Sequence, residues 1–248
     1  MSLIKSADDI KALRKGGKFL AETLEYARTL CIPGATLLDI DKAVDAKIRS
    51  YGCTPSFLGY EGFPNATCLS LNAEVVHGIP DRRTLKEGDI LGVDAGLWYD
   101  GRCVDGAVTV PVGTVSEDVT RLLKETERIL MLGIAAAKPF RRVGTISSTV
   151  QHAAEAENLG IVRALTGHGV GHHVHEDPEV PNYGHANDGM LLRPGMVIAI
   201  EPMLTLGKGD VYTEVDGWTV TTADGTLSAQ FEHTVLITQR GAEILTRV

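Results

Sequence analysis

The 248-residue sequence lacks the features of several special classes of protein. It has no basic surplus, and a formal net charge of −8 argues against a nucleic-acid-binding protein. No apolar run reaches membrane-spanning length, and the N-terminus leads into a charged helical pattern without the apolar segment of a secretory signal. The four cysteines form no Cys-x-x-Cys pair, which argues against a zinc ribbon or a thioredoxin-like site. We therefore expect a soluble, cytoplasmic protein with free thiols and no membrane or nucleic-acid partner.

Helical patterns occur in the same order in two parts of the chain. Each part has a long helix, a break, and a shorter helix that closes on glycine. This period is far longer than a solenoid unit, so it predicts two related halves, about 1–113 and 114–248, within one domain. The predicted helices run from Ser6 to a stop at Pro33, from about 37 to 50, from Ser116 to near Pro139, and from Val143 to Gly160.

Strand patterns follow each predicted helix pair. Two helices followed by strands in each half predict an α+β fold in which helices cover one face of a sheet. The predicted strands cover residues 65–71, 74–79, 89–97, 102–112, 161–165, 196–201, 211–215, 217–222 and 227–238.

Two aspartates mark the predicted strand pair between residues 89 and 112. Asp100-Gly101 is the turn signal, and a four-residue loop over 98–101 would place Asp94 directly opposite Asp105. Strand interiors seldom carry aspartate, and two carboxylates facing each other repel. A solvated sheet face is the simplest interpretation, whereas a bound cation would turn the repulsion into coordination.

The remaining candidate ligands are histidines and buried glutamates. Glycines frame His168 in the segment 167–178, where they indicate close backbone packing, with His168 and His175 projecting from an irregular stretch. Glu201 ends an apolar strand, and Glu232 lies inside the long strand predicted over 227–238. A buried, unpaired carboxylate costs several kcal/mol, so each glutamate should be protonated, paired or bound to metal.

Four carboxylates and one imidazole suit a site for two divalent metal ions. Oxygen ligands with one histidine favour Mn, Fe, Co or Zn over a thiolate-type site. A bridging water would lose its proton near neutral pH and become a nucleophile. A nearby carboxylate would take that proton and pass it to a leaving amine. The donor set therefore predicts metal-assisted hydrolysis, most simply of an amide.

Along nearly its whole length the sequence resembles the type I methionine aminopeptidases, which have the pita-bread fold. The matching segments are 58–64, 72–80, 94–105, 167–176, 200–202 and 230–234. The resemblance implies two pseudo-symmetric halves whose helices cover a curved, mainly antiparallel sheet. It implies that the metal ligands are Asp94, Asp105, His168, Glu201 and Glu232. It also implies that His77 and His175 contact the scissile amide and carbonyl, that Glu201 shuttles the proton, and that Tyr60, Phe63, Cys68 and Trp218 form the methionine pocket.

The function implied by this resemblance is removal of the initiator methionine from nascent or new polypeptides with a small second residue. A metal-bridging hydroxide would attack the scissile carbonyl. The expected partner is a peptide N-terminus, the ribosome is a candidate second partner, and the chain is expected to be a monomer. The sequence departs from the family at Val174, where an aromatic residue is common, and at Gly106-Ala107, where polar residues are common. These departures bear on the pocket and the substrate range, and His172 and His173 receive no role.

Two other functions are consistent with parts of the pattern. A proline-specific peptidase of the same fold uses the same five ligands, although such enzymes usually carry a large additional N-terminal domain. A non-catalytic binding protein on this fold would normally have lost ligands, and all five are present here.

Overall fold

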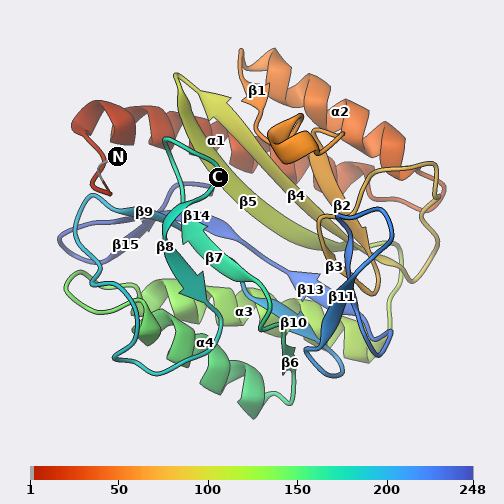
Figure 1. Ribbon diagram of the computed structural model, residues 1–248. Helices are drawn as coiled ribbons and strands as arrows, with labels where there is room; N and C mark the ends of the chain where they lie inside the picture. Colours follow the sequence, from red (N-terminus) through yellow and green to blue (C-terminus); the bar gives the residue numbers. More distant parts are fainter. Residues whose placement is uncertain (1–2, 248) are drawn as a thin grey trace.

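The structure is a computed structural model that describes residues 3–247. Helices lie on the outside and strands between them: α1 and α2 lie above the strands in Figure 1, and α3 and α4 lie below. The first long helix packs against β4 (Ile90–Tyr99) and β5 (Arg102–Pro111), and α3 packs against β10 (Met203–Thr205) and β13 (Ser228–Gln230). The strands are therefore covered by two helix pairs, which are α1 (Ala7–Leu30) with α2 (Leu37–Ser50), and α3 (Glu117–Ala136) with α4 (Gly144–Ala156).

Helix boundaries follow local capping chemistry. Ser6 caps α1 in a capping box, in which its hydroxyl accepts from the Asp9 amide and the Asp9 carboxylate accepts from the Ser6 amide. Ser116 caps α3 with one hydrogen bond, which its hydroxyl accepts from the Val119 amide. The four predicted helices are confirmed, and a short 3₁₀ helix, η1 (Tyr60–Gly62), is added.

The strands pair antiparallel throughout residues 3–247. In one sheet β4 pairs with β5 on one side and with β1 and β2 on the other, and the other sheets have the orders β15-β14-β9-β7-β8, β13-β10-β6 and β11-β12-β3. The α+β class is thus confirmed. The strands are β1 (Thr54–Pro55), β2 (Thr67–Leu71), β3 (Glu74–Val76), β4 (Ile90–Tyr99), β5 (Arg102–Pro111), β6 (Gly160–Ile161), β7 (Thr166–Gly169), β8 (Glu176–Pro181), β9 (Val197–Ile200), β10 (Met203–Thr205), β11 (Val211–Thr213), β12 (Val220–Thr222), β13 (Ser228–Gln230), β14 (His233–Ile237) and β15 (Ala242–Ile244).

The predicted register of the β4–β5 hairpin is wrong. The turn contains two residues, because Asp100 and Gly101 both adopt positive φ (49° and 69°), which is the backbone geometry of a type I′ turn. Asp94 therefore pairs with Ala107, and Asp105 pairs with Gly96. Because side chains alternate across a strand, the two aspartates still share one face, as diagonal neighbours rather than as a facing pair.

Two further predictions about the candidate ligands need correction. The strand predicted over 227–238 is interrupted, so that Glu232 lies in the break between β13 and β14. The Glu232 amide donates instead to the Ala107 carbonyl of β5. His168 lies on β7 rather than on an irregular stretch, and β7 changes register at this point. Both candidate ligands therefore occupy local interruptions of regular strand pairing.

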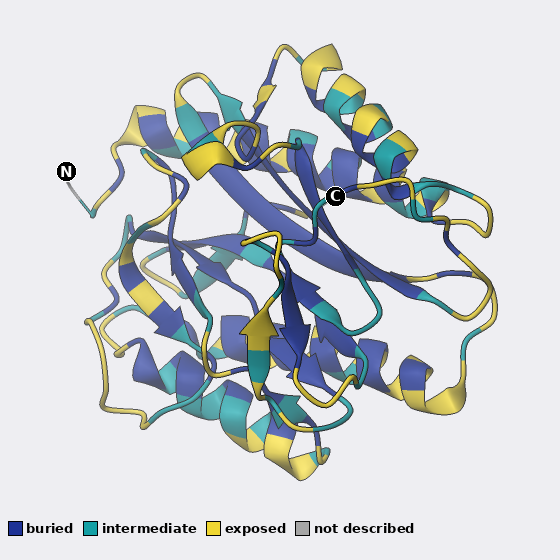
Figure 2. Cartoon of the chain, turned by 45° about the vertical axis from the view of Figure 1, so that its right-hand side comes forward, coloured by how far each residue is buried: buried dark blue, intermediate teal, exposed yellow. Residues whose placement is uncertain are grey.

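The core lies between the helices and the strands. In Figure 2 the strands are mostly buried, and the helices expose only their outer faces. The glycines around His168 pack tightly, since a Cβ on Gly167 would lie 2.4 Å from the Ala199 carbonyl oxygen.

Within residues 3–247, no helix combines the length and apolarity that crossing a membrane requires. The relation between two halves of the chain stays a prediction.

Candidate metal centre and substrate cavity

The eleven candidate residues named from the sequence meet around one cavity of about 320 Å³. They come from segments far apart in the chain, and the strand pairings bring them together. The polar candidates are His77, Asp94, Asp105, His168, His175, Glu201 and Glu232, and the candidates for an apolar pocket are Tyr60, Phe63, Cys68 and Trp218.

Four carboxylates and His168 form the floor of this cavity. One potential ligand atom each from Asp105, His168 and Glu232 lies within 4.8 Å of the other two. His168 Nε2 is 3.5 Å from Glu201 Oε1 and 4.0 Å from Asp105 Oδ2. The Asp94 carboxylate interacts directly with that of Asp105. All five side chains are buried.

The tautomer of His168 can be assigned from its hydrogen bond. Its Nδ1 is 2.9 Å from the Gly169 carbonyl oxygen, which can only accept, so Nδ1 carries the proton. Burial, and secondarily His175, lower the pKa of His168 to about 4, so the ring is neutral at pH 7. Nε2 then presents a lone pair to two carboxylate oxygens. A bound cation would stabilise this arrangement, in which the Nε2 lone pair of His168 faces carboxylate oxygens that also carry lone pairs.

The electrostatics of the four carboxylates also fit divalent cations. Burial raises the pKa of Asp105 to about 7. Burial, followed by the charge of Asp105, raises the pKa of Asp94, Glu201 and Glu232 well above their ordinary values. Asp94 Oδ1 and Glu232 Oε1 are buried without a hydrogen-bond partner among the described residues. Buried, unsatisfied carboxylate oxygens are costly, so their convergence fits a cation site.

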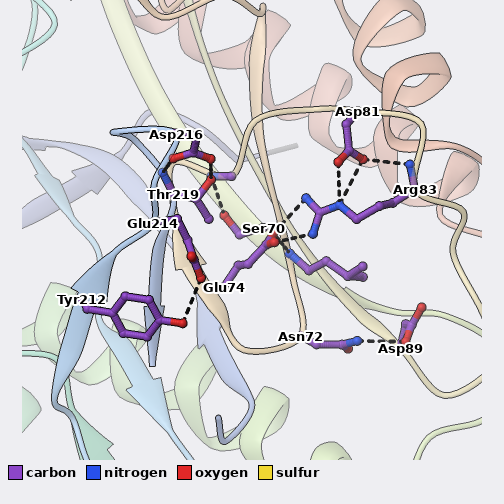
Figure 3. A network of polar contacts seen from close by, with 12 residues as sticks. Ser70, Asn72, Glu74, Asp81, Arg83, Asp89, Tyr212, Glu214, Asp216 and Thr219 are labelled. Carbon is purple, nitrogen blue, oxygen red and sulfur yellow. Dashed lines mark hydrogen bonds and ion pairs between the residues drawn. The ribbon is translucent and has the colours of Figure 1, made fainter. Parts of the chain in front are cut away.

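His77 reaches the cavity from a strained turn after β3. Its φ is 58°, and a Cβ on the following Gly78 would lie 2.3 Å from the Leu69 carbonyl oxygen, so this turn requires glycine there. Arg83 holds the segment by donating to Glu74 and Asp81, as Figure 3 shows. Burial, then the neighbouring His175, lowers the pKa of His77 to about 4.

His175 lies beside His168 in the cavity lining. The two rings meet edge to face, with centroids 4.4 Å apart. The hydroxyl of Tyr60 lies 3.0 Å from His175 Nδ1 and orients the ring. Burial lowers the pKa of His175, so both cavity histidines outside the carboxylate cluster are neutral at pH 7.

The apolar candidates form a cup next to the carboxylates. Cys68 on β2 pairs directly with Asp94 on β4, so the cup and the candidate metal centre share a wall. Phe63 and Trp218 meet edge to face with centroids 5.2 Å apart. Asp216 positions Trp218 by accepting a hydrogen bond from its backbone amide at 2.8 Å. Asp216 also accepts a hydrogen bond from the Thr219 hydroxyl (Figure 3).

Some cavity residues were not identified from the sequence. Gln230 lines the cavity, and its Nε2 donates to Glu201 Oε2 at 3.1 Å, which fixes that carboxylate. The available signal was a polar residue two positions before Glu232 in an apolar strand. Met203 and Leu165 also line the cavity, and nothing in their local sequence distinguishes them from core residues.

The α+β fold and a buried carboxylate–imidazole centre together define a metal-dependent hydrolase. Residues 11–239 match the model of metallopeptidase family M24, and the chain belongs to this family. It is 44% identical to methionine aminopeptidase 1 of Bacillus subtilis over all 248 residues, which cover 100% of both chains.

Solved structures of the family show the same fold. A methionine aminopeptidase from Thermotoga maritima superposes with a TM-score of 0.97 at 43% identity, with 99% of each chain covered. A prolidase from Pyrococcus furiosus shares the fold at a TM-score of 0.81 and 22% identity, over 99% of this chain and 66% of that one. The pita-bread fold and the resemblance to methionine aminopeptidases are therefore confirmed.

Proposed function

We propose that this chain is a methionine aminopeptidase that removes the N-terminal methionine from peptides and new polypeptides. The observation that carries the proposal is the shared wall between cup and metal centre, formed where Cys68 pairs with Asp94. A methionine side chain in the cup would place its own α-amino group and the next peptide bond beside the carboxylates. Full-length similarity to proteins of that activity supports the same conclusion.

The side chains that would hold the metal are the four carboxylates and His168. We propose two divalent ions, of Mn, Fe, Co or Zn, because four carboxylates around one imidazole exceed the charge that one divalent ion balances. Bound divalent ions supply Lewis acidity and lower the pKa of water toward neutrality. The proposed ligands are Asp94, Asp105, His168, Glu201 and Glu232.

Glu201 is the proposed proton shuttle. It follows β9, where Gln230 holds one of its carboxylate oxygens and Asn182 donates to its backbone carbonyl at 3.1 Å. Burial and the charge of Asp105 raise its pKa, which brings a carboxylate closer to the range in which it can accept and return a proton at neutral pH. Glu201 would take the proton of the attacking water and deliver it to the leaving amine.

His77 and His175 are the proposed contacts to the scissile amide. Both rings are neutral at pH 7 and can donate a hydrogen bond without adding a second cation near the metals. The Tyr60 hydroxyl occupies His175 Nδ1, so Nε2 is the ring nitrogen left for a substrate. Hydrogen bonds that strengthen as charge develops on the carbonyl oxygen would lower the barrier.

The methionine pocket is proposed to consist of Tyr60, Phe63, Cys68 and Trp218. A linear thioether side chain suits such a cup, since sulfur makes favourable contacts with aromatic rings. We propose that a small second residue is preferred. We also place the reaction in the cytoplasm, which agrees with four free, buried thiols, and expect a monomer that meets nascent-chain N-termini, with the ribosome as a candidate partner.

The test compares Met-Ala-Ser with Gly-Pro-Ala as substrates. The protein is stripped with EDTA and reconstituted with Mn, Fe or Co, and Asp94→Asn serves as the control that removes a proposed ligand. Release of methionine from the first peptide only, lost in the variant, is expected. Cleavage of Gly-Pro-Ala instead would identify a proline-specific peptidase, and metal binding without cleavage of either peptide would identify a non-catalytic binding protein.

A further inference from the structure

A buried lysine ion pair lies behind the loop that carries His175. The Lys5 side chain is only 1% exposed, although it belongs to the short segment before α1. Lysine is almost never buried without a partner. The Lys5 ammonium donates to Glu176 Oε2 at 2.5 Å, across 171 residues of sequence. The charge of Lys5 is therefore balanced by a carboxylate from a distant part of the chain.

The Glu176 carboxylate that pairs with Lys5 also binds the loop backbone. Its second oxygen, Oε1, accepts from the amides of His172 at 2.5 Å and of His173 at 2.9 Å. Burial by itself would raise the pKa of Glu176, but the bonds from Lys5 and from these two amides lower it. The carboxylate is thus charged, and it ties the loop 171–175 to the N-terminal segment immediately before β8 begins.

Gly171 and His172 of the same loop make further contacts. Gly171 lies against the lysine stem, and a Cβ there would be 2.6 Å from Lys5 Cε. The Gly171 carbonyl accepts from the amide of Cys103 at 2.7 Å, and Cys103 lies two residues before Asp105 on β5. The His172 ring lies 3.4 Å from Lys5 Nζ and 3.4 Å from Asp9 Oδ2.

We propose that Lys5 is a positioning residue, which holds His175 at the metal centre by fixing Glu176 and through it the loop 171–175. This inference rests on the hydrolysis proposed above, because it concerns the residue that would contact the scissile carbonyl. His175 is adjacent to Glu176 in sequence, and the Glu176 carboxylate holds the loop amides of His172 and His173, so a shift of the loop backbone would displace the imidazole. Displacing a catalytic group by about 1 Å can cost about 100-fold in rate.

The test substitutes Lys5→Met, which keeps the buried stem and removes only the ammonium. Hydrogen exchange of the His172 and His173 amides is followed by NMR, and kcat and KM are measured with Met-Ala-Ser. We expect exchange of both amides at least about 10-fold faster. We expect kcat to fall about 10- to 100-fold with KM and the inhibition constant of free methionine nearly unchanged, because the cup lies on other segments.

Three control variants separate positioning from general loss of stability. Lys124→Met removes an exposed lysine on α3 and should change neither readout. Ile146→Val removes a buried methylene from α4 and so lowers thermal stability away from the loop. If its loss of thermal stability equals that of Lys5→Met, its kcat should still be unchanged. The double variant Lys5→Met/Glu176→Gln removes both charges, and its effect on kcat should be smaller than the product of the single effects.

Two results would overturn the proposal. The first is unchanged exchange of the His172 and His173 amides in Lys5→Met, which would show that the lysine does not order the loop. The second is faster exchange with a kcat no lower than that of Ile146→Val, which would show a purely structural anchor. A wild-type protein that releases no methionine would refute the proposed function alone, and the exchange measurement would still decide whether Lys5 orders the loop.

Discussion

Replacing Asp105 by asparagine should stabilise the metal-free protein while removing its response to metal. Asp105 lies at the centre of the carboxylate cluster, where burial raises its pKa from 3.8 to about 7. Holding this group charged therefore costs the fold about 4 kcal/mol above pH 7, since each pH unit corresponds to about 1.4 kcal/mol. Asparagine has the same shape, keeps an oxygen for the Gly106 amide, and can donate to Asp94.

The sign of the effect follows from the direction of this pKa. An acid whose pKa is higher in the folded state binds more protons there, so its stabilising contribution is complete below pH 3.8 and is lost as the pH rises to about 7. At pH 8 we expect metal-free Asp105→Asn to be more stable than wild type by about 2–4 kcal/mol, or roughly 5–15 °C in Tm. At pH 5 the difference should shrink to about 1–2 kcal/mol.

The assay is thermal and urea unfolding of EDTA-treated protein from pH 5 to pH 8, with and without Mn²⁺. Wild type should gain stability on adding Mn²⁺, and Asp105→Asn should gain much less. Asp210→Asn, at an exposed position, serves as the matched control and should follow wild type at every pH. A metal-free Asp105→Asn protein that is no more stable than wild type at pH 8 would contradict this electrostatic account.

Three other substitutions test separate parts of the site. Trp218→Ala removes one wall of the cup and should raise KM for Met-Ala-Ser about 10-fold with little change in kcat; an effect on kcat alone, in steady-state kinetics, would argue against a binding role. His77→Ala should lower kcat about 100-fold at unchanged metal content, and full activity would exclude a contact to the reacting amide. Gly78→Ala places a Cβ 2.3 Å from the Leu69 carbonyl oxygen and should destabilise the fold by at least about 2 kcal/mol, so an unchanged urea midpoint would refute the close packing.

Local sequence signals predicted the helices and the chemistry of the candidate site. Ser6 and Ser116 cap α1 and α3 as expected, because capping depends on residues only three positions apart. The carboxylate candidates could also be identified from the sequence, because an aspartate or glutamate inside an apolar strand is costly without a partner. All eleven candidate residues line one cavity, and their individual roles stay proposals.

Other features were decided only by the tertiary structure. The register of the β4–β5 hairpin is not one of them, because Asp-Gly is a preferred sequence of the two-residue type I′ turn, which places Asp94 and Asp105 diagonally. The interruption at Glu232 exists because its amide bonds to β5 rather than continuing a ladder. The pairing of Lys5 with Glu176 joins residues 171 positions apart, and no local pattern can encode such a contact. The sequence by itself thus determined the helices and the donor chemistry, which arise from neighbouring residues, and long-range packing determined where each donor lies.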